Sequence, residues 1–534
     1  MLKKIYVEHF KTLDRLELAF NDDFNIIVGD NETGKSTLLE AIGMALTGQL
    51  YGRYIAAELS PYLFNKRVVD KYIQQLRKGN SVKPPSILIE LYLKETPETA
   101  KFKGSNNTAR ENATGVSLRI EFDDNYKDEY EKYISDPSKI VSVPSEYYAV
   151  NWYSFAFNNI TKQSLPINTT LIDTATIRLQ NRTDYYIHEI INDSLTPKER
   201  TQLALTYRQL KQSFSEDDSL KRINTQLRTG KGKVSDKDLS VSIDISQRTS
   251  WEASLTSYLD DIPFQYIGRG DQSILKTLLA LEKKADGTHV ILIEEPENHL
   301  SYSTMNKLIN MISEKCQGRQ VFITTHSTFV LNKLGLDRVI LIGNDLQTLS
   351  LKDLSPDTQK YFKKLPGYDS LRLLIAKKGI LVEGSSDELF VQRAYRQIHG
   401  KLPINDGIDV ICVRGSSFKP FLEIAKITKK DVVVITDNDK DYQRNVEKKY
   451  SEYLAVPNIK INYDKDNNAP TLEHQIVKCN ELKTLTSILG SDKKTKEELI
   501  EYMVSNKTEW ALRIFDTSQD IRIPKYIGDA IGKK

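Results

Sequence analysis

The spacing of apolar residues divides this chain into short strands and longer helices. Runs in which nearly every position is apolar, at 24–28, 290–293 and 321–323, predict strands that are covered on both faces. Longer stretches with an apolar residue at every third or fourth position follow these runs and predict helices. Strands that alternate with helices predict an α/β fold with a parallel sheet.

One segment breaks this alternation. Residues 184–227 contain no glycine and a single proline, Pro197, and their apolar residues recur at helical spacing. We therefore expect a helical hairpin inserted between two sheet segments. Its apolar stripe fits either a core position or a contact with a second copy of the chain, and the sequence leaves both interpretations open.

A second α/β series begins after a charged stretch that contains the helix breakers Pro356 and Pro366. Strands are predicted at 379–382, 410–413 and 432–435, and the tail is polar and mostly helical. The predicted organisation is a first domain in two parts (1–183 and 236–345), a helical insert (184–235), a linker (346–376) and a second α/β domain with a helical C-terminal extension (377–534).

The composition excludes some classes of protein but does not indicate a specific binding partner. The 75 Lys and Arg residues nearly balance the 72 Asp and Glu residues, so a polyanion would have to meet a local basic patch. The three cysteines show neither metal-binding spacing nor a disulfide pattern, which favours a reducing cytoplasm. The sequence contains no signal peptide and no apolar run of membrane length, so no membrane association is expected.

The first candidate site follows the apolar run 24–28. The residues Gly29-Asp-Asn-Glu-Thr-Gly-Lys-Ser36 fit a phosphate-binding loop, and a helical run follows them. Such a loop turns backbone amides toward a triphosphate at a helix N-terminus, with the lysine on the phosphates and the serine on Mg²⁺. A glycine turn that carries a lysine by chance is the weaker interpretation. The residues predicted to bind ATP here are Gly29, Asn31, Gly34, Lys35, Ser36 and Thr37.

Two acids end the apolar run 290–293, where a nucleotide hydrolase needs them. Glu294 is predicted to face the Mg²⁺ ion and Glu295 to position the attacking water. Gly268 and Gly270 precede a predicted helix, and His326 follows the run 321–323.

In this order, the motifs resemble those of the ABC-type ATPase heads of RecF, SMC and Rad50 proteins, over residues 1 to about 345. The resemblance implies that Gly268 and Gly270 contact the nucleotide of a second subunit and that His326 contacts the γ phosphate. Two positions depart from the family pattern: Glu294 stands where aspartate is usual, and Arg269 where a small residue is usual. Both departures are expected to slow hydrolysis.

The second candidate site is acidic. Glu383 ends the strand 379–382, and Asp387 follows on the first turn of the next helix. Asp437 and Asp439 come after the strand 432–435, and residues two apart on an extended chain point the same way. Acids at the carboxyl ends of parallel strands can converge, and ligands that offer only oxygen favour Mg²⁺ or Mn²⁺. A surface acidic loop or a calcium site is the alternative.

This arrangement resembles a Toprim domain, and an ABC-type head followed by Toprim resembles the overcoming-lysogenisation-defect (OLD) nucleases. That family includes the nuclease subunits of Gabija antiviral systems and retron-associated nucleases. Thr471-Leu-Glu473 and Asn506-Lys507-Thr-Glu-Trp resemble its later motifs. The resemblance implies that Lys507 stabilises the transition state and that two metal ions lie among Glu383, Asp387, Asp437, Asp439 and Glu473.

The sequence therefore predicts an ATP-regulated, metal-dependent endonuclease or nickase that acts on double-stranded DNA in defence against phage. We expect a dimer or tetramer, alone or beside a helicase or a retron reverse transcriptase with its msDNA. The alternative is a RecF- or SMC-like DNA-repair ATPase whose Toprim domain binds DNA without cutting it. No long heptad repeat interrupts the head, as it does in SMC and Rad50 proteins, which weighs against that alternative.

Overall fold

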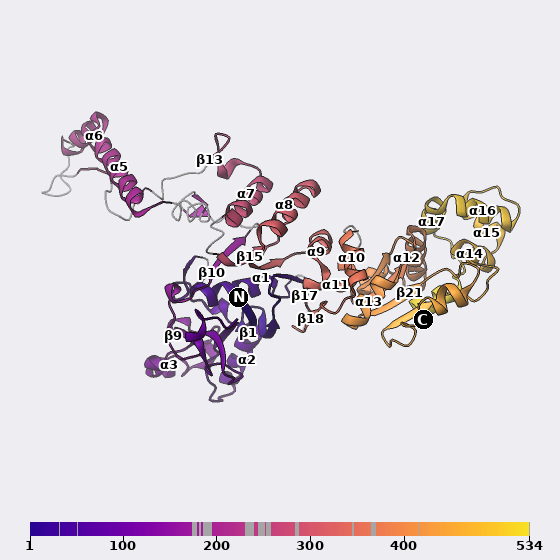
Figure 1. The fold of residues 1–534 in the computed structure, drawn as a ribbon, viewed down its shortest axis with the longest axis horizontal. Coiled ribbons are helices and arrows are strands. Elements are labelled where there is room, and N and C mark those ends of the chain that lie inside the picture. Colours follow the sequence, from indigo (N-terminus) through magenta and orange to yellow (C-terminus); the bar gives the residue numbers. More distant parts are fainter. Residues whose placement is uncertain are drawn as a thin grey trace. The chain divides into compact units, whose positions relative to one another are not determined.

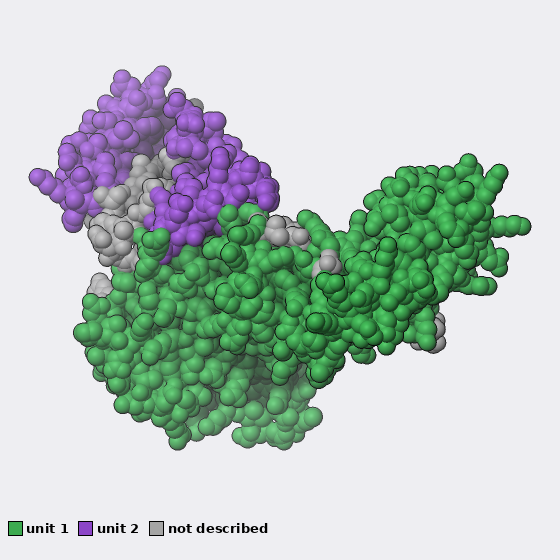
Figure 2. Space-filling view, turned by 45° about the vertical axis from the view of Figure 1, so that its right-hand side comes forward, with its two compact units in different colours: residues 1–169, 289–292, 317–534 green, residues 170–288, 293–316 purple. Residues whose placement is uncertain are grey.

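The structure is a computed structural model, and the chain forms two compact units in it (Figure 2). The first unit comprises Met1–Thr169, His289–Leu292 and Gln317–Lys534, and the second comprises Thr170–Thr288 and Ile293–Cys316. The described residues are 1–30, 32–50, 52–173, 179–180, 183–184, 195–229, 240–243, 251, 258–282, 288–343, 346–364, 370–415 and 417–532. No helix in these ranges is long and apolar enough to cross a lipid bilayer.

An antiparallel sheet opens the chain (Figure 1). Its strands run in the order β2-β1-β6-β8, and β7 and β9 both pair with β8. Polar and apolar positions alternate along β2, which predicts a strand with one buried face. The strands are β1 (Leu2–Phe10), β2 (Leu13–Ala19), β6 (Ile87–Leu93), β7 (Lys103–Gly104), β8 (Ala113–Phe122) and β9 (Tyr148–Ser154).

A second sheet carries the phosphate-binding loop. Its order is β10-β15-β16-β3-β17-β18, and β3 runs parallel to both of its neighbours. Every residue of β3 is buried, as its uninterrupted apolar sequence predicts. The strands are β3 (Phe24–Gly29), β10 (Asn168–Asp173), β15 (Thr288–Glu294), β16 (Gln320–Thr324), β17 (Val339–Ile342) and β18 (Thr348–Ser350).

Helix α1 (Lys35–Thr47) lies in the core between these sheets. It contacts β1, β6 and β8 of the antiparallel sheet and β3 and β16 of the parallel one, so it is apolar on most of its surface. Gly48 ends the helix with a left-handed φ of 65°, and a Cβ there would lie 2.7 Å from the Trp152 ring. The helix predicted after the loop, with glycine at its end, is confirmed.

The C-terminal part contains a four-stranded parallel sheet in the order β20-β19-β21-β22. These strands are β19 (Lys378–Val382), β20 (Ile408–Cys412), β21 (Asp431–Ile435) and β22 (Ile459–Asn462). The helices are α12 (Ser385–His399), α13 (Lys419–Thr428), α14 (Leu472–Cys479), α15 (Leu482–Leu489), α16 (Lys496–Ser505), α17 (Lys507–Asp516) and α18 (Lys525–Ile531). The largest fully buried side chain of its core is Trp510. The predicted α/β fold is confirmed.

The predicted linker 346–376 is built into the fold. Strand β18 pairs antiparallel with β17 at the edge of the sheet that carries the phosphate-binding loop, while α10 (Pro356–Lys364) and α11 (Ser370–Ile375) contact α13 of the C-terminal part. The stretch was predicted to be a linker because of its charges and of Pro356 and Pro366, but Pro356 is the first residue of α10, a position that accepts proline.

In the second unit, the described part of the insert forms the predicted helical hairpin. Helices α5 (Pro197–Ser215) and α6 (Asp218–Thr229) contact each other, and a capping box between Thr196 and Glu199 starts α5. Leu205, Leu210 and Phe214 of α5 are more than half exposed. The same unit contains α7 (Arg269–Glu282) and α8 (Tyr302–Lys315).

Candidate functional site

The loop between β3 and α1 has the backbone that a phosphate site requires. Gly34 stands at the N-cap of α1 with φ 94°, and a Cβ there would lie 2.6 Å from the Leu13 side chain. A Cβ on Gly29 would lie 2.6 Å from the carbonyl oxygen of Ile342. Packing therefore demands glycine at both positions, and the loop leads directly into a helix N-terminus.

Lys35 is folded back over this loop. Its ammonium donates hydrogen bonds to the carbonyl oxygens of Gly29 (3.1 Å) and Asp30 (2.8 Å), and its side chain is buried. A buried lysine held at the loop backbone is placed to meet phosphate oxygens that bind there.

The other predicted residues of this half are near the same edge of the sheet. Ser36 is exposed, whereas Thr37 is buried with its hydroxyl 3.1 Å from that of Thr12. His326 is exposed just beyond β16, and because β16 is parallel to β3, both strands end at this edge. Asn31 lies outside the described residues.

Four further predicted residues belong to the second unit: Gly268, Gly270, Glu294 and Glu295. Glu294 is the last residue of β15, and Glu295 follows with φ 43°, an uncommon value for a residue other than glycine. The Asn298 amide donates to Glu295 Oε2 (2.7 Å). A Cβ on Gly270 would lie 2.8 Å from the carbonyl oxygen of His299, so α7 starts tightly against the loop after β15.

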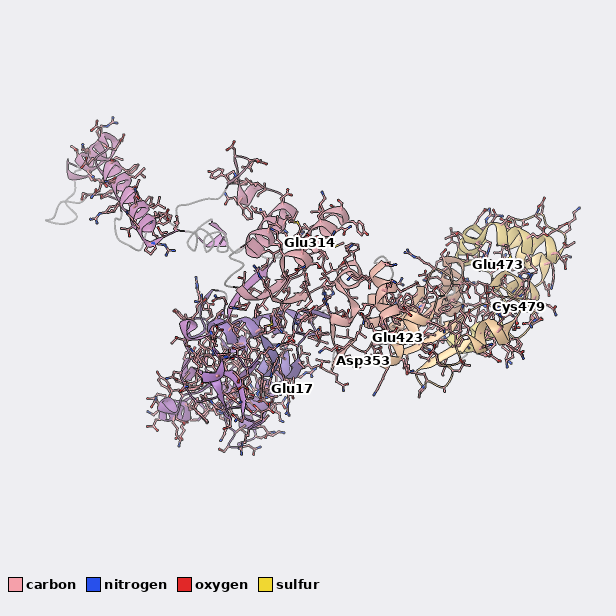
Figure 3. All side chains as sticks on the ribbon, in the orientation of Figure 1. Glu17, Glu314, Asp353, Glu423, Glu473 and Cys479 are labelled. Carbon is pink, nitrogen blue, oxygen red and sulfur yellow. The ribbon has the colours of Figure 1, made fainter. Side chains whose placement is uncertain are left out.

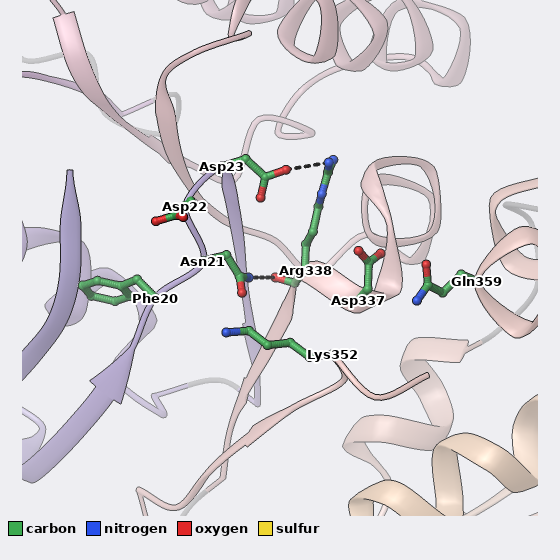
Figure 4. Close-up of a pocket in the computed structure, with 8 residues that line it drawn as sticks. All are labelled: Phe20, Asn21, Asp22, Asp23, Asp337, Arg338, Lys352 and Gln359. Atoms are coloured by element: carbon green, nitrogen blue, oxygen red, sulfur yellow. Dashed lines mark hydrogen bonds and ion pairs between the residues drawn. The ribbon is translucent and has the colours of Figure 1, made fainter. Parts of the chain in front are cut away.

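A cavity of about 440 Å³ lies away from the phosphate-binding loop (Figure 4). Most of its lining residues precede β3 or β17, hence lie at the opposite ends of these strands, and Lys352 and Gln359 complete it. An ion pair of 2.6 Å between Asp23 and Arg338 occupies its wall, together with a hydrogen bond of 3.4 Å from Asn21 Nδ2 to the Arg338 carbonyl. Because Arg338 is already paired in this way, we assign the cavity no ligand.

The acidic site forms where β19 and β21 end. These strands are parallel neighbours, so Glu383 and Asp437 emerge at the same edge of the sheet. Glu383 Oε1 accepts hydrogen bonds from the Asp437 amide (3.2 Å) and the Thr436 hydroxyl (2.6 Å). Asp387 begins α12 and accepts from the Gly384 amide (3.0 Å). The structure thus brings three predicted ligands together.

Glu473 joins them from the first turn of α14 (Figure 3). Its side chain is buried, and Oε2 accepts a hydrogen bond of 2.6 Å from the Thr471 hydroxyl. The Lys507 ammonium, at the start of α17, lies 4.0 Å from Glu473 Oε1 and is more than half exposed. Lys507 therefore contacts the acidic site and can also be reached from solvent.

Burial and repulsion from neighbouring carboxylates disfavour the charged forms of Asp387 and Asp437. Burial first, and then Glu383 and Glu473, raise the pKa of Asp387 to about 7. Burial, followed by the charges of Asp387 and its neighbours including Asp439, raises the pKa of Asp437 well above its ordinary value. The charges of the other four predicted ligands therefore act on Asp437, including that of the exposed Asp439.

The donor chemistry fits a hard divalent cation, because every candidate ligand is a carboxylate. In the described part of the chain, no three His, Cys, Asp or Glu side chains are already arranged to hold a metal ion. Glu383, Asp387 and Glu473 each accept a hydrogen bond from a neighbouring donor. Binding a cation would require them to turn from these donors toward it.

Sequence patterns missed the residues that support the site. Thr436 holds Glu383, and Asn438, which is 2% exposed, donates to the carbonyl oxygens of Asp464 (3.0 Å) and Asp466 (2.9 Å). In the sequence, Asn438 lies between two predicted ligands, and this position was the only signal of its role. Asp441, by contrast, is exposed and accepts from the Arg444 amide (3.1 Å), which makes it a cap of the following helical turn.

Comparison with known proteins decides the family. Residues 1–331 match the family described as AAA ATPase domain, and residues 374–439 match the one described as overcoming lysogenization defect protein-like, TOPRIM domain. This chain belongs to the OLD family of ATPase–Toprim nucleases. The family predicted from the motifs is confirmed.

Individual relatives of this OLD-family chain are distant. Endonuclease GajA of Bacillus cereus (strain VD045) is 21% identical over 462 residues, which cover 82% of this chain and 74% of that protein. The DNA replication and repair protein RecF of Pasteurella multocida (strain Pm70) is 30% identical over 92 residues, which cover 15% of this chain and 26% of that protein. A solved C-terminal region of the Burkholderia pseudomallei OLD protein is 18% identical and covers 29% of this chain and 96% of that chain, with a TM-score of 0.24, too low to carry an argument.

We expect Lys35→Ala to weaken ATP binding by roughly 10- to 100-fold, because a charged hydrogen-bond donor to the phosphates is removed. Titration with a fluorescent ATP analogue measures the change. Lys66→Ala, at an exposed lysine on helix α2 (Lys66–Arg77), is the control and should bind as the wild type does. Unchanged affinity in Lys35→Ala would refute the role given to this loop.

Asp387→Asn should stabilise the metal-free protein at pH 8. Folding raises the pKa of this carboxyl to about 7. The contribution of the carboxyl to stability is therefore fully present below its ordinary pKa and is lost as the pH rises through about 7. We expect the thermal midpoint in EDTA to rise by roughly 2 °C or more at pH 8, and by clearly less at pH 5, where only part of the cost has built up. Added Mn²⁺ should stabilise the wild type more than the variant.

The exposed Asp492 offers the control, because Asp492→Asn should leave the midpoint unchanged at both pH values. A lower midpoint for Asp387→Asn at pH 8 would show that Asp387 does not experience the repulsion described.

Proposed function

We propose that this chain is a divalent-metal-dependent DNA endonuclease or nickase whose cutting is controlled by ATP, acting in defence against phage. The observation that carries the proposal is the gathering of Glu383, Asp387, Asp437 and Glu473 at one edge of a parallel sheet, with the Lys507 ammonium beside them. The similarity to endonuclease GajA over most of the chain supports DNA cleavage as the reaction.

In this proposal, Glu383, Asp387, Asp437, Asp439 and Glu473 hold Mg²⁺ or Mn²⁺. When bound, such ions supply an activated water and neutralise charge on the phosphodiester. The protein's own contribution is orientation: Thr436 and the Asp437 amide hold Glu383, and Thr471 holds Glu473. Lys507, half-exposed at the rim, stabilises negative charge that develops on the phosphate oxygens.

Control by ATP is supported by a continuous series of contacts inside the first unit. Helix α9 (Thr328–Leu334) begins directly after His326 and Ser327 and contacts both α10 and α11. These two helices contact α13, where the rings of Phe362 and Phe421 lie 5.1 Å apart. The turn before α13 reaches the acidic site, because the Gly415 amide donates to the Glu383 carbonyl oxygen (2.8 Å).

The contact between α10 and α13 is polar and specific. Glu423 of α13 (Figure 3) accepts hydrogen bonds from the Ser355 amide (2.5 Å) and hydroxyl (2.7 Å), and from the Thr358 hydroxyl. Its carboxylate therefore lies at the N-terminus of α10, where the helix dipole favours a negative charge. Arg372 of α11 adds a second polar contact to the same domain, because it donates to Asp409 of β20 (2.9 Å).

We further propose that the α5–α6 hairpin forms a contact between two copies of the chain. Leu205, Leu210 and Phe214 expose apolar surface along α5, and a second copy that presents the same helix would bury it.

The second candidate function is a DNA-repair ATPase that binds DNA without cutting it. The similarity to RecF favours it, but it covers only 15% of the chain. Incubation of supercoiled plasmid with the protein and Mg²⁺ or Mn²⁺ distinguishes the two functions. Nicked or linear product supports the nuclease, and intact plasmid supports the repair ATPase.

Glu383→Ala and Asp437→Ala should each abolish plasmid cleavage and leave ATP affinity unchanged, because both residues belong to the acidic site only. Gel assay of plasmid and titration with an ATP analogue measure the two activities separately. The exposed Glu481 supplies a control, since Glu481→Ala should cleave normally. Cleavage retained in either acidic-site variant would refute the site.

Glu423→Ala should separate ATP binding from its effect on cleavage, because it removes three hydrogen bonds between the linker and α13. We expect normal ATP affinity and basal cleavage, with the ratio of cleavage rates with and without ATP shifted toward one. Glu452→Gln is the matched control, since it removes only the exposed ion pair with Lys419 at the start of α13 (3.4 Å). An unchanged ATP response in Glu423→Ala would contradict this route.

A further inference from the structure

Three cations follow the acids of the candidate site at intervals of four residues. Lys440 comes directly after Asp439, and Arg444 and Lys448 follow it. The segment Gln443–Lys448 (η12) is π-helical, a form that is frequent at functional sites. Arg444 and Lys448 are four residues apart in this segment, which makes them neighbours on its surface, and Lys440 stands in the turn before it with φ 70°. We refer to Lys440, Arg444 and Lys448 as the basic row.

All three side chains of the basic row are exposed, and none is paired with a carboxylate of the described chain. Nearby cations differ in this respect. Lys465 lies 3.8 Å from Glu447, and the Lys449 ammonium lies over the Tyr450 ring at 5.1 Å. The basic row is therefore the part of this segment with positive charge left to meet a partner.

Hydrogen bonds fix the row to the acidic loop. The Asn445 side chain donates to the carbonyl oxygens of Asn438 (3.3 Å) and Asp439 (3.1 Å). The Lys440 amide donates to Asn438 Oδ1 (3.0 Å), and Asn438 is itself buried. These hydrogen bonds hold the backbone that carries the cations close to the loop of the predicted metal ligands.

The loop that carries Lys440 also lies against the turn before α14, the helix that carries Glu473. His474 directly follows Glu473, and its Nδ1 lies 2.9 Å from the Thr471 hydroxyl. The Asn438 and Asp439 amides donate to the carbonyl oxygen of Pro470 (3.2 and 3.3 Å), which directly precedes Thr471. The row therefore starts beside the turn that leads to Glu473 and continues along η12.

We infer that the basic row binds successive phosphates of the DNA strand that enters the acidic site. The inference rests on the proposed nuclease function. A cluster of carboxylates repels a polyanion, and a chain with a net charge of +3 offers no general attraction, so local cations must supply it. Contacts to phosphates position a strand without reading its sequence, so the row is expected to act on any DNA sequence.

The test is DNA affinity as a function of salt, measured by fluorescence anisotropy with a duplex oligonucleotide in EDTA, where cleavage is off. Lys440→Gln, Arg444→Gln and Lys448→Gln are combined in one full-length variant. Each lost phosphate contact reduces the slope of log affinity against log salt by about one, so the slope should fall by about two to three. The combined variant Lys440→Arg, Arg444→Lys and Lys448→Arg should retain wild-type affinity.

A matched control carries Lys483→Gln, Lys494→Gln and Lys496→Gln, which remove three exposed lysines from the α15–α16 region of the same domain. It should bind DNA with the wild-type slope. A wild-type slope in the basic-row variant, or an equal loss of slope in the control, would overturn the inference. Equal thermal midpoints and equal Mn²⁺ affinity in all variants establish that folding and the acidic site are intact.

Cleavage assays separate this inference from the proposed function. With Mg²⁺ or Mn²⁺, the basic-row variant should cleave poorly at low DNA concentration and reach the wild-type rate at saturating DNA. If the wild type itself does not cleave, the proposed function fails, while the salt slope in EDTA still decides whether the row binds DNA.

Discussion

Repulsion between carboxylates crowded at one sheet edge is the constraint on which the acidic site of the C-terminal domain depends. Parallel strands end at a common edge, and this edge gathers acids from β19 and β21 with two more from the first turns of α12 and α14. Burial and neighbouring charge raise the pKa of Asp387 and Asp437, so the folded chain bears a cost in the metal-free state. A divalent cation would relieve that cost, and the same arrangement that disfavours folding therefore favours metal binding.

The rest of the domain holds these acids in place. An apolar core that includes Trp510 lies under the site, and donors from Thr436, Gly384 and Thr471 orient the individual carboxylates. The linker helices extend this support toward the ATPase part, since Glu423 caps α10 and the turn before α13 is bonded to Glu383. In the proposed control by ATP, these contacts would connect α9 with the acids.

Much of this architecture could be predicted from the sequence. Buried strands such as β3 and the loop at Gly29 have local signatures, and acids placed after apolar runs follow from the rule that strand ends bind ligands. The strand β22 was not predicted, because Ile459-Lys-Ile-Asn462 contains only two apolar residues. The linker helices were missed because Pro356, taken as a helix breaker, is in fact the first residue of α10.

The supporting contacts could not be predicted because they join distant parts of the chain. Thr436 and Glu383 are 53 positions apart, and Ser355 and Glu423 are 68 apart. No periodicity or motif specifies such a pair, since each depends on how the elements pack. The acidic residues could therefore be named in advance, whereas the residues that orient them required the structure.

The most direct test of this account is crystallography with Mn²⁺ and anomalous diffraction. The account predicts anomalous density in contact with the carboxylates of Glu383 and Asp437, with Asp387 and Glu473 turned toward it. An absence of density at these carboxylates under saturating Mn²⁺, or a Mn²⁺ ion bound only elsewhere on the chain, would contradict it.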